Sequence, residues 1–243
     1  MTTLEDEVVI VTGASQGLGA SMAKRFAREG ASVTITARSE SDLQAVADAV
    51  DGEIHVAPAD VTDEAAVRDV VATTVDAFGS VTGLVNNAGI GLLNMYDEGR
   101  LLHDVDTEDF RQIMEVNVTG VFLCSKYAVP EMIEAGHGNV VNISSGLGRR
   151  GSARWGPYVT SKWALEGMTR TQAKELDEYG INANALDPGG RVDTGFWDHL
   201  PESERAEILD PDVMNDAATG LLAQGPDGVT GESLPAEEWE QRL

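Results

Sequence analysis

Tyr158 and Lys162 stand four residues apart, a spacing that could support acid–base chemistry. Residues i and i+4 share one face of a helix, so the phenol and the ammonium could act together. A free tyrosine has a pKa of about 10, which is too high for a good base at neutral pH. Because a neighbouring ammonium favours the phenolate, we expect Lys162 to lower the pKa of Tyr158. The pair could then donate a proton to a carbonyl oxygen or accept one from an alcohol. The alternative is an ordinary exposed pair on a helix.

A glycine-rich turn, TGASQGLG, stands between the first apolar run of the chain and the first helical pattern. Glycines allow a tight turn and let backbone N–H groups approach a pyrophosphate, to which the helix N-terminus adds the positive end of its dipole. We therefore predict that a dinucleotide binds here, although by itself such a sequence could form only a tight turn. The residues expected to contact it are Gly13, Ser15, Gln16, Gly17, Leu18 and Gly19.

Ala37 and Arg38 end the second apolar run, the place where dinucleotide-binding domains select between cofactors. An acidic residue here binds a ribose 2′-hydroxyl, whereas an arginine suits a 2′-phosphate. The neutral Ala37 and the cationic Arg38 favour NADP, with NAD as the alternative if Arg38 is only a solvated loop residue. Asp60, at the end of the third run, is expected at the adenine edge. Alternatively, Asp60 or Thr62 caps the next helix.

Apolar runs alternate with helical patterns along the whole chain. Runs such as VVIV and VVNI are nearly continuous in apolar residues, as is typical of strands buried on both faces. The alternation predicts a single α/β domain over residues 1–243, with a seven-stranded parallel sheet and helices on both faces. Segment 90–106 stays unassigned. We expect strands at residues 8–12, 32–37, 54–60, 83–87, 139–144, 181–186 and 229–234, and helices at 63–78, 107–135, 158–179 and 211–224 after a first helix that ends at Gly30.

A series of motifs resembles the short-chain dehydrogenase/reductase family over roughly residues 6–234. The motifs, in the order and at about the spacing of that family, are TGASQGLG, Asp60-Val61, NNAG at 86–89, Asn117, Ser145, YVTSK at 158–162 and Pro188-Gly189. The resemblance implies a Rossmann-type doubly wound fold and NADP(H)-dependent hydride transfer between the nicotinamide and a carbonyl or secondary alcohol. One alternative is an NAD-dependent alcohol dehydrogenase of the same family. Another is a dinucleotide-sensing protein without turnover, against which the intact Ser145, Tyr158 and Lys162 set argues.

The resemblance also implies roles for single residues. Tyr158 is the acid–base group, Lys162 also bonds the nicotinamide ribose, and Ser145 polarises the substrate oxygen, whereas Ser144 is structural. Asn117 bends its helix and holds a water that joins Lys162 to solvent, with a plain packing role as the alternative. Relatives often form dimers or tetramers through two long helices, so we expect a homodimer or homotetramer assembled through 107–135 and 158–179. Further cofactor contacts are expected from Val61, Asn87, Ala88, Gly89, Pro188, Gly189 and Thr194.

Three segments depart from the family pattern. The chain is longer between Asn87 and Asn117, and the excess is expected to form part of the substrate mouth. The segment after Pro188 is one residue longer than usual, which leaves open whether Thr194 reaches the nicotinamide carboxamide. The chain closes in PAEEWEQRL, where Trp239 either covers a subunit interface or packs on its own domain.

Substrate contacts are less well defined by the sequence. Arg149, Arg150 and Arg154 form a cationic group that could bind a substrate anion or pair with carboxylates. No metal is expected, because His103, His137 and His199 lack a second ligand at metal spacing. An apolar substrate pocket could be lined by Leu147, Trp155, Met95, Phe196 and Trp197.

The composition is strongly acidic, with 41 Asp and Glu against 17 Lys and Arg and a net charge of −24. Nucleic acid and anionic membrane are poor partners for such a surface. We interpret the charge as adaptation to molar salt, where the Debye length falls to about 3 Å. The single cysteine, Cys124, excludes internal disulfides, and no run approaches the roughly 20 apolar residues of a membrane span. The opening MTTLEDEVVI lacks the features of a signal peptide, so a cytoplasmic protein with a small-molecule substrate is expected.

Overall fold

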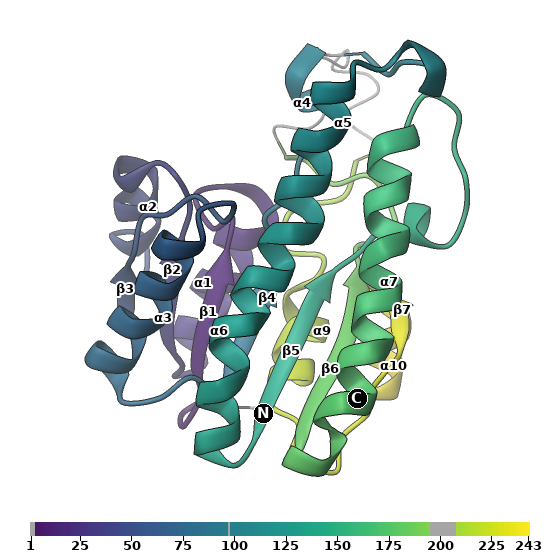
Figure 1. Cartoon of the computed structure of the whole chain (residues 1–243). Coiled ribbons are helices and arrows are strands. Elements are labelled where there is room, and N and C mark those ends of the chain that lie inside the picture. The colour runs from purple at the N-terminus through teal and green to yellow at the C-terminus, as the bar shows by residue number, and fades with distance from the viewer. Residues whose placement is uncertain (1–2, 97, 195–207) are drawn as a thin grey trace.

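Seven parallel strands form one continuous sheet in the order β3-β2-β1-β4-β5-β6-β7 (Figure 1). The computed structural model describes residues 3–96, 98–194 and 208–243. The strands are β1 (Val8–Thr12), β2 (Ser32–Thr36), β3 (Ile54–Val56), β4 (Gly83–Asn86), β5 (Gly138–Ile143), β6 (Ile181–Asp187) and β7 (Ser233–Pro235). The predicted Rossmann-type fold is confirmed.

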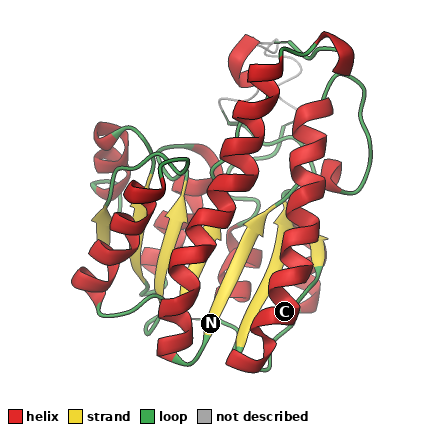
Figure 2. Ribbon diagram, in the orientation of Figure 1, coloured by secondary structure: helices red, strands yellow, loops and turns green. Residues whose placement is uncertain are grey.

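Helices cover both faces of the sheet (Figure 2). One core joins the sheet to α1, α2, α9 and α10, and it includes Phe26, Leu43, Leu221 and Trp239. The other core joins the sheet to α3, α6 and α7, and it includes Val70, Leu123, Met132 and Leu176. The helices are α1 (Gly17–Arg28), α2 (Glu40–Ala47), α3 (Glu64–Phe78), α4 (Leu93–Tyr96), α5 (Thr107–Met114), α6 (Gly120–Ala135), α7 (Gly156–Leu176), α9 (Asn215–Leu222) and α10 (Ala236–Arg242).

The strand order reverses between β1 and β4. The chain runs outward from β1 through β2 to β3, returns through α3, and continues outward on the other side from β4 to β7. Val11 of β1 pairs with Val85 of β4, so the loops that follow these two strands emerge side by side. In open α/β sheets ligands bind at the carboxyl ends of the strands at such a reversal point. The fold therefore places the glycine turn after β1 next to the NNAG segment after β4.

Several expected boundaries are wrong. The last strand was expected at 229–234, but β7 begins only at Ser233, because Thr230 and Gly231 instead bond the backbone of Ala183 from a turn. The helix expected at 211–224 begins at Asn215 rather than at 211. The predicted helix 107–135 is interrupted by a π-helical turn at Glu115–Thr119, which joins α5 to α6. The unassigned segment 90–106 contains α4 and a 3-10 turn at Leu102–Asp104.

The C-terminal segment packs on its own subunit. The Trp239 side chain is fully buried, and its indole N–H donates to the carbonyl of Ala185 on β6 at 3.0 Å. Of the two alternatives for this residue, packing within the domain is therefore the one observed. The buried indole anchors α10 against α9 and β6.

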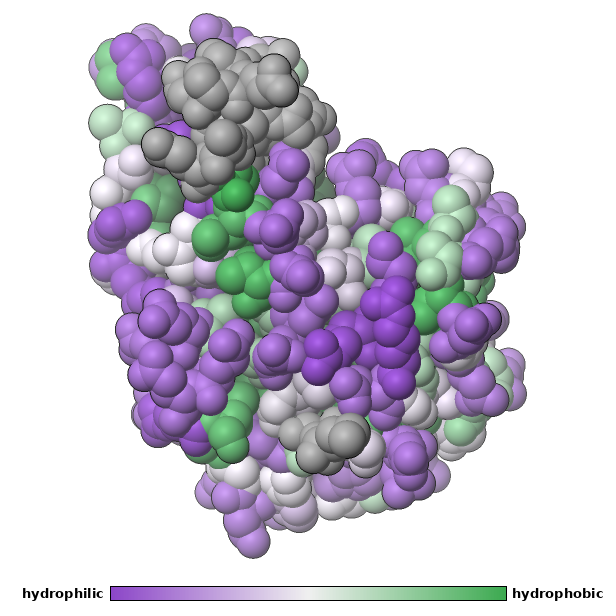
Figure 3. Space-filling view, turned by 180° about the vertical axis from the view of Figure 1, so that it is seen from behind, coloured by the Kyte–Doolittle hydropathy of each residue, from purple (hydrophilic) through white to green (hydrophobic). Residues whose placement is uncertain are grey.

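The face seen in Figure 3 is mostly hydrophilic, with scattered apolar side chains. Within the described residues, no helix is both long enough and apolar enough to cross a membrane.

Candidate active site

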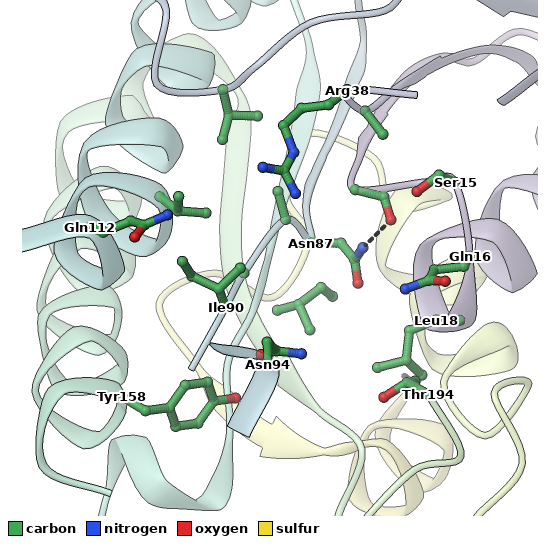
Figure 4. A pocket seen from close by; sticks show the side chains of 18 of the residues that line it. Ser15, Gln16, Leu18, Arg38, Asn87, Ile90, Asn94, Gln112, Tyr158 and Thr194 are labelled. Carbon is green, nitrogen blue, oxygen red and sulfur yellow. Dashed lines mark hydrogen bonds between the residues drawn. The ribbon is translucent and has the colours of Figure 1, made fainter. Parts of the chain in front are cut away.

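A cavity of about 1190 Å³ opens at the carboxyl ends of the strands, at the point where their order reverses (Figure 4). This volume exceeds that of an ordinary small-ligand pocket, so it has room for a dinucleotide and a substrate together. The predicted site residues in its wall are Gly13, Ser15, Gln16, Gly17, Leu18, Arg38, Asp60, Val61, Asn87, Ala88, Gly89, Ser145, Tyr158, Lys162, Pro188 and Thr194. Three predicted residues, Gly19, Asn117 and Gly189, do not line the cavity.

The N-terminus of α1 fits a phosphate. Gln16 at the helix start makes no side-chain capping bond, and the first turn contains no acidic residue. The first N–H groups of an α-helix have no partner within the helix, so here they are available to an anion in the cavity. By contrast, α3 is capped by the Asp63 carboxylate, which accepts from Ala65 and Ala66. Asp63, and neither Asp60 nor Thr62, is therefore the cap of that helix.

Two glycines of the turn are required by close packing. Gly13 has φ +64°, and a Cβ there would lie 2.8 Å from the Cα of Ala88. A Cβ on Gly19 would lie 2.5 Å from both the Gly13 carbonyl oxygen and the Asn87 amide nitrogen. The third, Gly17, faces Thr194, whose methyl would be 2.9 Å from such a Cβ. Thr194 therefore lies against the glycine turn (Figure 4).

Hydrogen bonds join the NNAG segment, which follows β4, to the end of β1. The Asn87 amide donates to the carbonyls of Thr12 at 2.9 Å and Gly13 at 3.1 Å. The Thr12 hydroxyl accepts the backbone N–H groups of Asn87 and Ala88, both at 3.0 Å. Asn86 instead donates to the Asn142 side chain of β5 at 2.9 Å. NNAG thus supports the central sheet and shapes the cofactor wall.

Arg38 extends from the end of β2 into the cavity (Figure 4). Its guanidinium is exposed, and the described residues provide it with no hydrogen-bond or ion-pair partner. The Asp60 carboxylate is held by Thr62, whose backbone N–H and hydroxyl donate to one oxygen at 2.9 and 2.8 Å. A free guanidinium near the end of β2 fits a phosphate, and a fixed carboxylate in the loop after β3 fits an adenine amino group.

Tyr158 and Ser145 lie together in the cavity wall. The Tyr158 phenol bonds the Ser145 hydroxyl, and the Trp155 ring packs edge-on against the phenol with centroids 5.8 Å apart. Burial raises the pKa of Tyr158 to about 12, the Ser145 bond opposes the rise, and the Asp187 carboxylate adds to it. The expected lowering of this pKa is therefore not found, because desolvation of the phenolate outweighs the neighbouring groups.

Lys162 is buried one turn further along α7. Its ammonium donates to the carbonyl of Ile143 at 2.7 Å and lies 5.5 Å from the centroid of the Tyr158 ring. Burial lowers the pKa of Lys162 to about 8, while the Glu166 carboxylate acts in the opposite direction. The predicted helical pair does share one face of α7, but the lysine is fixed to β5 rather than to the phenol.

Asn117 is buried in the π-helical turn between α5 and α6. Its amide accepts from the Ile90 N–H at 2.8 Å and donates to the Ile90 carbonyl at 2.9 Å and to the Ser161 hydroxyl at 3.0 Å. A Cβ placed on Gly89 would lie 3.4 Å from the Asn117 oxygen and 3.8 Å from the Lys162 nitrogen. Asn117 thus ties the helix to the segment after NNAG and approaches the lysine across Gly89.

The other predicted substrate contacts divide into three groups. Met95 lines the cavity, whereas Leu147 and Trp155 do not. Phe196 and Trp197 lie outside the described residues, as does His199, which was considered only as a metal ligand. Arg149 pairs with Glu166 and Asp187, and Arg154 donates to the Gly99 carbonyl at 3.4 Å, so for Arg149 the carboxylate-pairing alternative holds.

The sequence reasoning missed several wall residues and one buried charge cluster. Asn94 projects toward the Tyr158 side of the cavity, and Ile90, Leu93 and Gln112 also line it (Figure 4). The carboxylates of Glu166 and Asp187 are almost fully buried. An apolar residue such as Ile90 carries no functional signal in a single sequence. Glu166, four residues after Lys162, and Asp187, just before Pro188, could have been noted from their positions in the sequence.

Comparisons with known proteins all point to one family. A model described as short chain dehydrogenase matches residues 7–205. A 2,5-dichloro-2,5-cyclohexadiene-1,4-diol dehydrogenase from Sphingobium indicum is 34% identical over 249 residues, covering 98% of this chain and 98% of its own. Levodione reductase from Leifsonia aquatica is 34% identical over 239 residues, covering 96% of this chain and 85% of its own.

Solved structures agree with these relatives. The crystal structure of carveol dehydrogenase from Mycobacterium avium in complex with NAD matches with a TM-score of 0.89 and 26% identity, covering 97% of each chain. The named relatives are dehydrogenases or reductases, and the cavity has room for a nicotinamide dinucleotide beside the uncapped N-terminus of α1. The chain therefore belongs to the short-chain dehydrogenase family and is an NAD(P)-dependent oxidoreductase that acts on alcohol or carbonyl groups.

Proposed function

We propose that this enzyme transfers hydride between NADP(H) and a carbonyl or secondary alcohol carbon, with Tyr158 as the acid–base group. The observation that carries the proposal is the hydrogen-bonded Ser145 and Tyr158 pair in the cavity wall, with Lys162 on the same helix face. A dinucleotide sensor would have no use for this arrangement. Lys162, through its ammonium, and Asn117 complete the proposed catalytic set.

The proposed mechanism assigns one task to each residue. A bound nicotinamide cofactor supplies the hydride or accepts it. Tyr158 donates its phenolic proton to the carbonyl oxygen during reduction and takes it back during oxidation. Ser145 already accepts the Leu147 N–H at 3.2 Å, so its own hydroxyl proton is available to polarise the substrate oxygen.

The raised pKa of Tyr158 favours work as a proton donor. A phenol whose pKa lies at about 12 keeps its proton throughout the neutral range. Lys162, with a pKa lowered to about 8, carries an exchangeable proton close to neutrality and can restore the phenol after each turnover. The space between Lys162 and Asn117 across Gly89 supports a water-mediated path to solvent there.

The choice of NADP rests on Arg38. Its free guanidinium lies in the cavity wall at the end of β2, where a 2′-phosphate would make charge-assisted hydrogen bonds. NAD remains the alternative, since carveol dehydrogenase from Mycobacterium avium was solved with NAD. We therefore propose contacts from the glycine turn to the pyrophosphate, from Arg38 to the 2′-phosphate and from Asp60 to the adenine.

The described substrate wall favours a largely apolar substrate body. Ile90, Leu93 and Met95 contribute apolar side chains to the cavity, and Asn94 adds one amide among them. The Asn94 oxygen accepts the Gly91 N–H at 2.8 Å, which leaves its NH₂ group to face the cavity. We propose that this NH₂ group binds a second oxygen of the substrate, away from the reacting one.

Cofactor binding and turnover can be tested separately. NADPH and NADH are titrated by nicotinamide fluorescence in about molar KCl, and then a panel of apolar ketones, hydroxyketones and secondary alcohols is followed by nicotinamide absorbance. The proposal predicts tighter binding of NADPH and reduction of at least one ketone class. Tight binding with no turnover of any substrate would favour the sensor, and preference for NADH would favour the NAD-dependent alternative.

We further propose a homo-oligomer assembled through α6 and α7. These helices cover the same face of the sheet, and each exposes a large aromatic side chain, Phe122 and Trp163, to 52%. Apolar exposure of this kind on neighbouring helices is typical of subunit interfaces. Sedimentation of the wild type should give a dimer or tetramer, and sedimentation of Phe122→Glu a smaller species.

The acidic charge supports a cytoplasmic enzyme of a cell with high internal salt. A net charge of −24 is self-repulsive in dilute buffer and is screened in molar salt. The buried Cys124 thiol also suits a reducing compartment.

A further inference from the structure

A cluster of charged side chains, made of two buried carboxylates and the partly exposed Arg149, adjoins the proposed catalytic residues. The Arg149 guanidinium pairs with the Asp187 carboxylate, donates to the Ser233 hydroxyl at 2.6 Å and reaches Glu166 at 3.4 Å. The hydroxyls of Ser233 and Ser144 both donate to Glu166, at 2.8 and 2.6 Å. The cluster therefore joins the segment after β5, the end of β6, the start of β7 and α7.

Four of the five members of this cluster are near neighbours of the active site in the chain, Ser233 being the exception. Ser144 precedes Ser145, and Arg149 follows it by four residues on the same turn. Glu166 stands one helical turn after Lys162 on α7. Asp187 immediately precedes Pro188 and accepts the Gly189 N–H at 2.8 Å. Movement in the cluster would thus move the wall of the cavity on three sides.

Arg149 offsets one of the two negative charges in the cluster. The side chains of Glu166 and Asp187 are only 4% and 3% exposed, and Arg149 is the cation that contacts both. Arg170 approaches Glu166 at 3.8 Å, but its side chain is 61% exposed and the pair is weak. Glu232, beside Ser233, is paired with Arg242 at 3.4 Å. Without Arg149, the field of two buried carboxylates would act on the proton-transfer groups.

We propose that Arg149 is a positioning residue for the catalytic set: it offsets one of the two negative charges of the buried Glu166 and Asp187 carboxylates and thereby sets the protonation of Lys162 and Tyr158. The role in turnover rests on the function proposed above, whereas the electrostatic role does not. The groups that face Lys162 are Tyr158 and Glu166 on α7, with Asn117 neutral on the π-helical turn. Asp187 acts on Tyr158 from the end of β6 and raises its pKa.

Opposite substitutions in the cluster should shift the Lys162 titration in opposite directions. Arg149→Met removes a positive charge, so the remaining carboxylates favour the ammonium and the Lys162 pKa rises from about 8. Asp187→Asn and Glu166→Gln each remove a negative charge, so the pKa falls. We expect shifts of about half a unit or more in each direction. A role confined to packing would not produce opposite shifts.

The chain is well suited to a measurement that needs no turnover. It contains only four lysines, Lys24, Lys126, Lys162 and Lys174, so the ¹³Cε signals of labelled lysine can be titrated by NMR, with Lys162→Met identifying the signal of interest. Arg149→Lys keeps the charge and should leave the midpoint of the Lys162 titration unchanged. The double variant Arg149→Met/Asp187→Asn restores the charge balance, so it should return the midpoint toward the wild type, and it remains informative if Arg149→Met alone fails to fold.

The outcomes separate this inference from the proposed function. Opposite shifts, with the midpoint restored in the double variant, support the role of Arg149. Lys162 midpoints that stay at the wild-type value, or that move in the same direction in every variant, overturn the role of Arg149. Where the wild type reduces a ketone, the alkaline limb of its kcat/KM profile should move with the Lys162 midpoint. A wild type without turnover would defeat the proposed function alone, because the NMR titration would still decide the electrostatic role.

Discussion

Replacing Arg38 with alanine should weaken the binding of NADPH but not that of NADH. The guanidinium lies in the cavity wall at the end of β2, and the described residues offer it no competing partner. A hydrogen bond to a charged group contributes about 1.5–3 kcal/mol, which corresponds to roughly 10- to 150-fold in a dissociation constant. Because Arg38 is exposed and the assay contains molar salt, we expect the lower end, about tenfold, for NADPH. The affinity for NADH should change by less than about twofold, since NADH has no 2′-phosphate.

Arg111 provides a matched control for this titration. It also lines the cavity, but its guanidinium reaches Glu108 at 3.5 Å and its side chain is 69% exposed. Fluorescence titration of Arg111→Ala should give NADPH affinity within about twofold of the wild type. Equal weakening of NADPH and NADH in Arg38→Ala, or no weakening of either, would refute the assignment of Arg38 to the 2′-phosphate.

Three further predictions concern pH, packing and salt. The reductive kcat/KM should be level near neutrality and fall above about pH 8, where Lys162 loses its proton while Tyr158 retains its own; a level profile up to pH 10 would contradict this order. Asn117→Ala removes three hydrogen bonds and leaves the Ile90 backbone unpaired, so urea titration should show the free energy of unfolding lowered by about 2–4 kcal/mol, and an unchanged value would exclude the tie between the π-helical turn and Ile90. The melting temperature should rise from about 0.1 to 1 M KCl as the Debye length falls from about 10 to 3 Å, and an unchanged melting temperature would remove the case for salt adaptation.

Short-range signals in the sequence predicted the fold well. The apolar runs of β1 and β5 are buried along their whole length, and the glycine turn lies where a doubly wound sheet requires it. The last strand was misplaced because VTGESLP contains a turn whose bonds go to the neighbouring strand, and periodicity does not show such bonds. Trp239 could not be assigned from its position near the C-terminus, since its burial depends on Ala185, 54 residues earlier.

The site was predicted less completely, for electrostatic reasons. The Tyr158 and Lys162 spacing identified the pair, but it could not show that burial would outweigh the ammonium in setting the pKa of Tyr158. The cluster around Arg149 joins four segments between Ser144 and Ser233, so no local pattern reveals it. The role proposed for Arg38, by contrast, follows from the sequence because it depends only on the place of this residue after β2.

The central claim is that Tyr158 donates the proton, and Tyr158→Phe tests it most directly. The substitution removes one hydroxyl and leaves the ring that packs against Trp155. With a ketone that the wild type reduces, single-turnover kinetics in molar KCl should show reduction slowed by about 10²- to 10⁴-fold, the usual contribution of a general acid. Fluorescence titration should show unchanged NADPH affinity. A variant that binds NADPH normally and reduces the ketone at close to the wild-type rate would contradict the account.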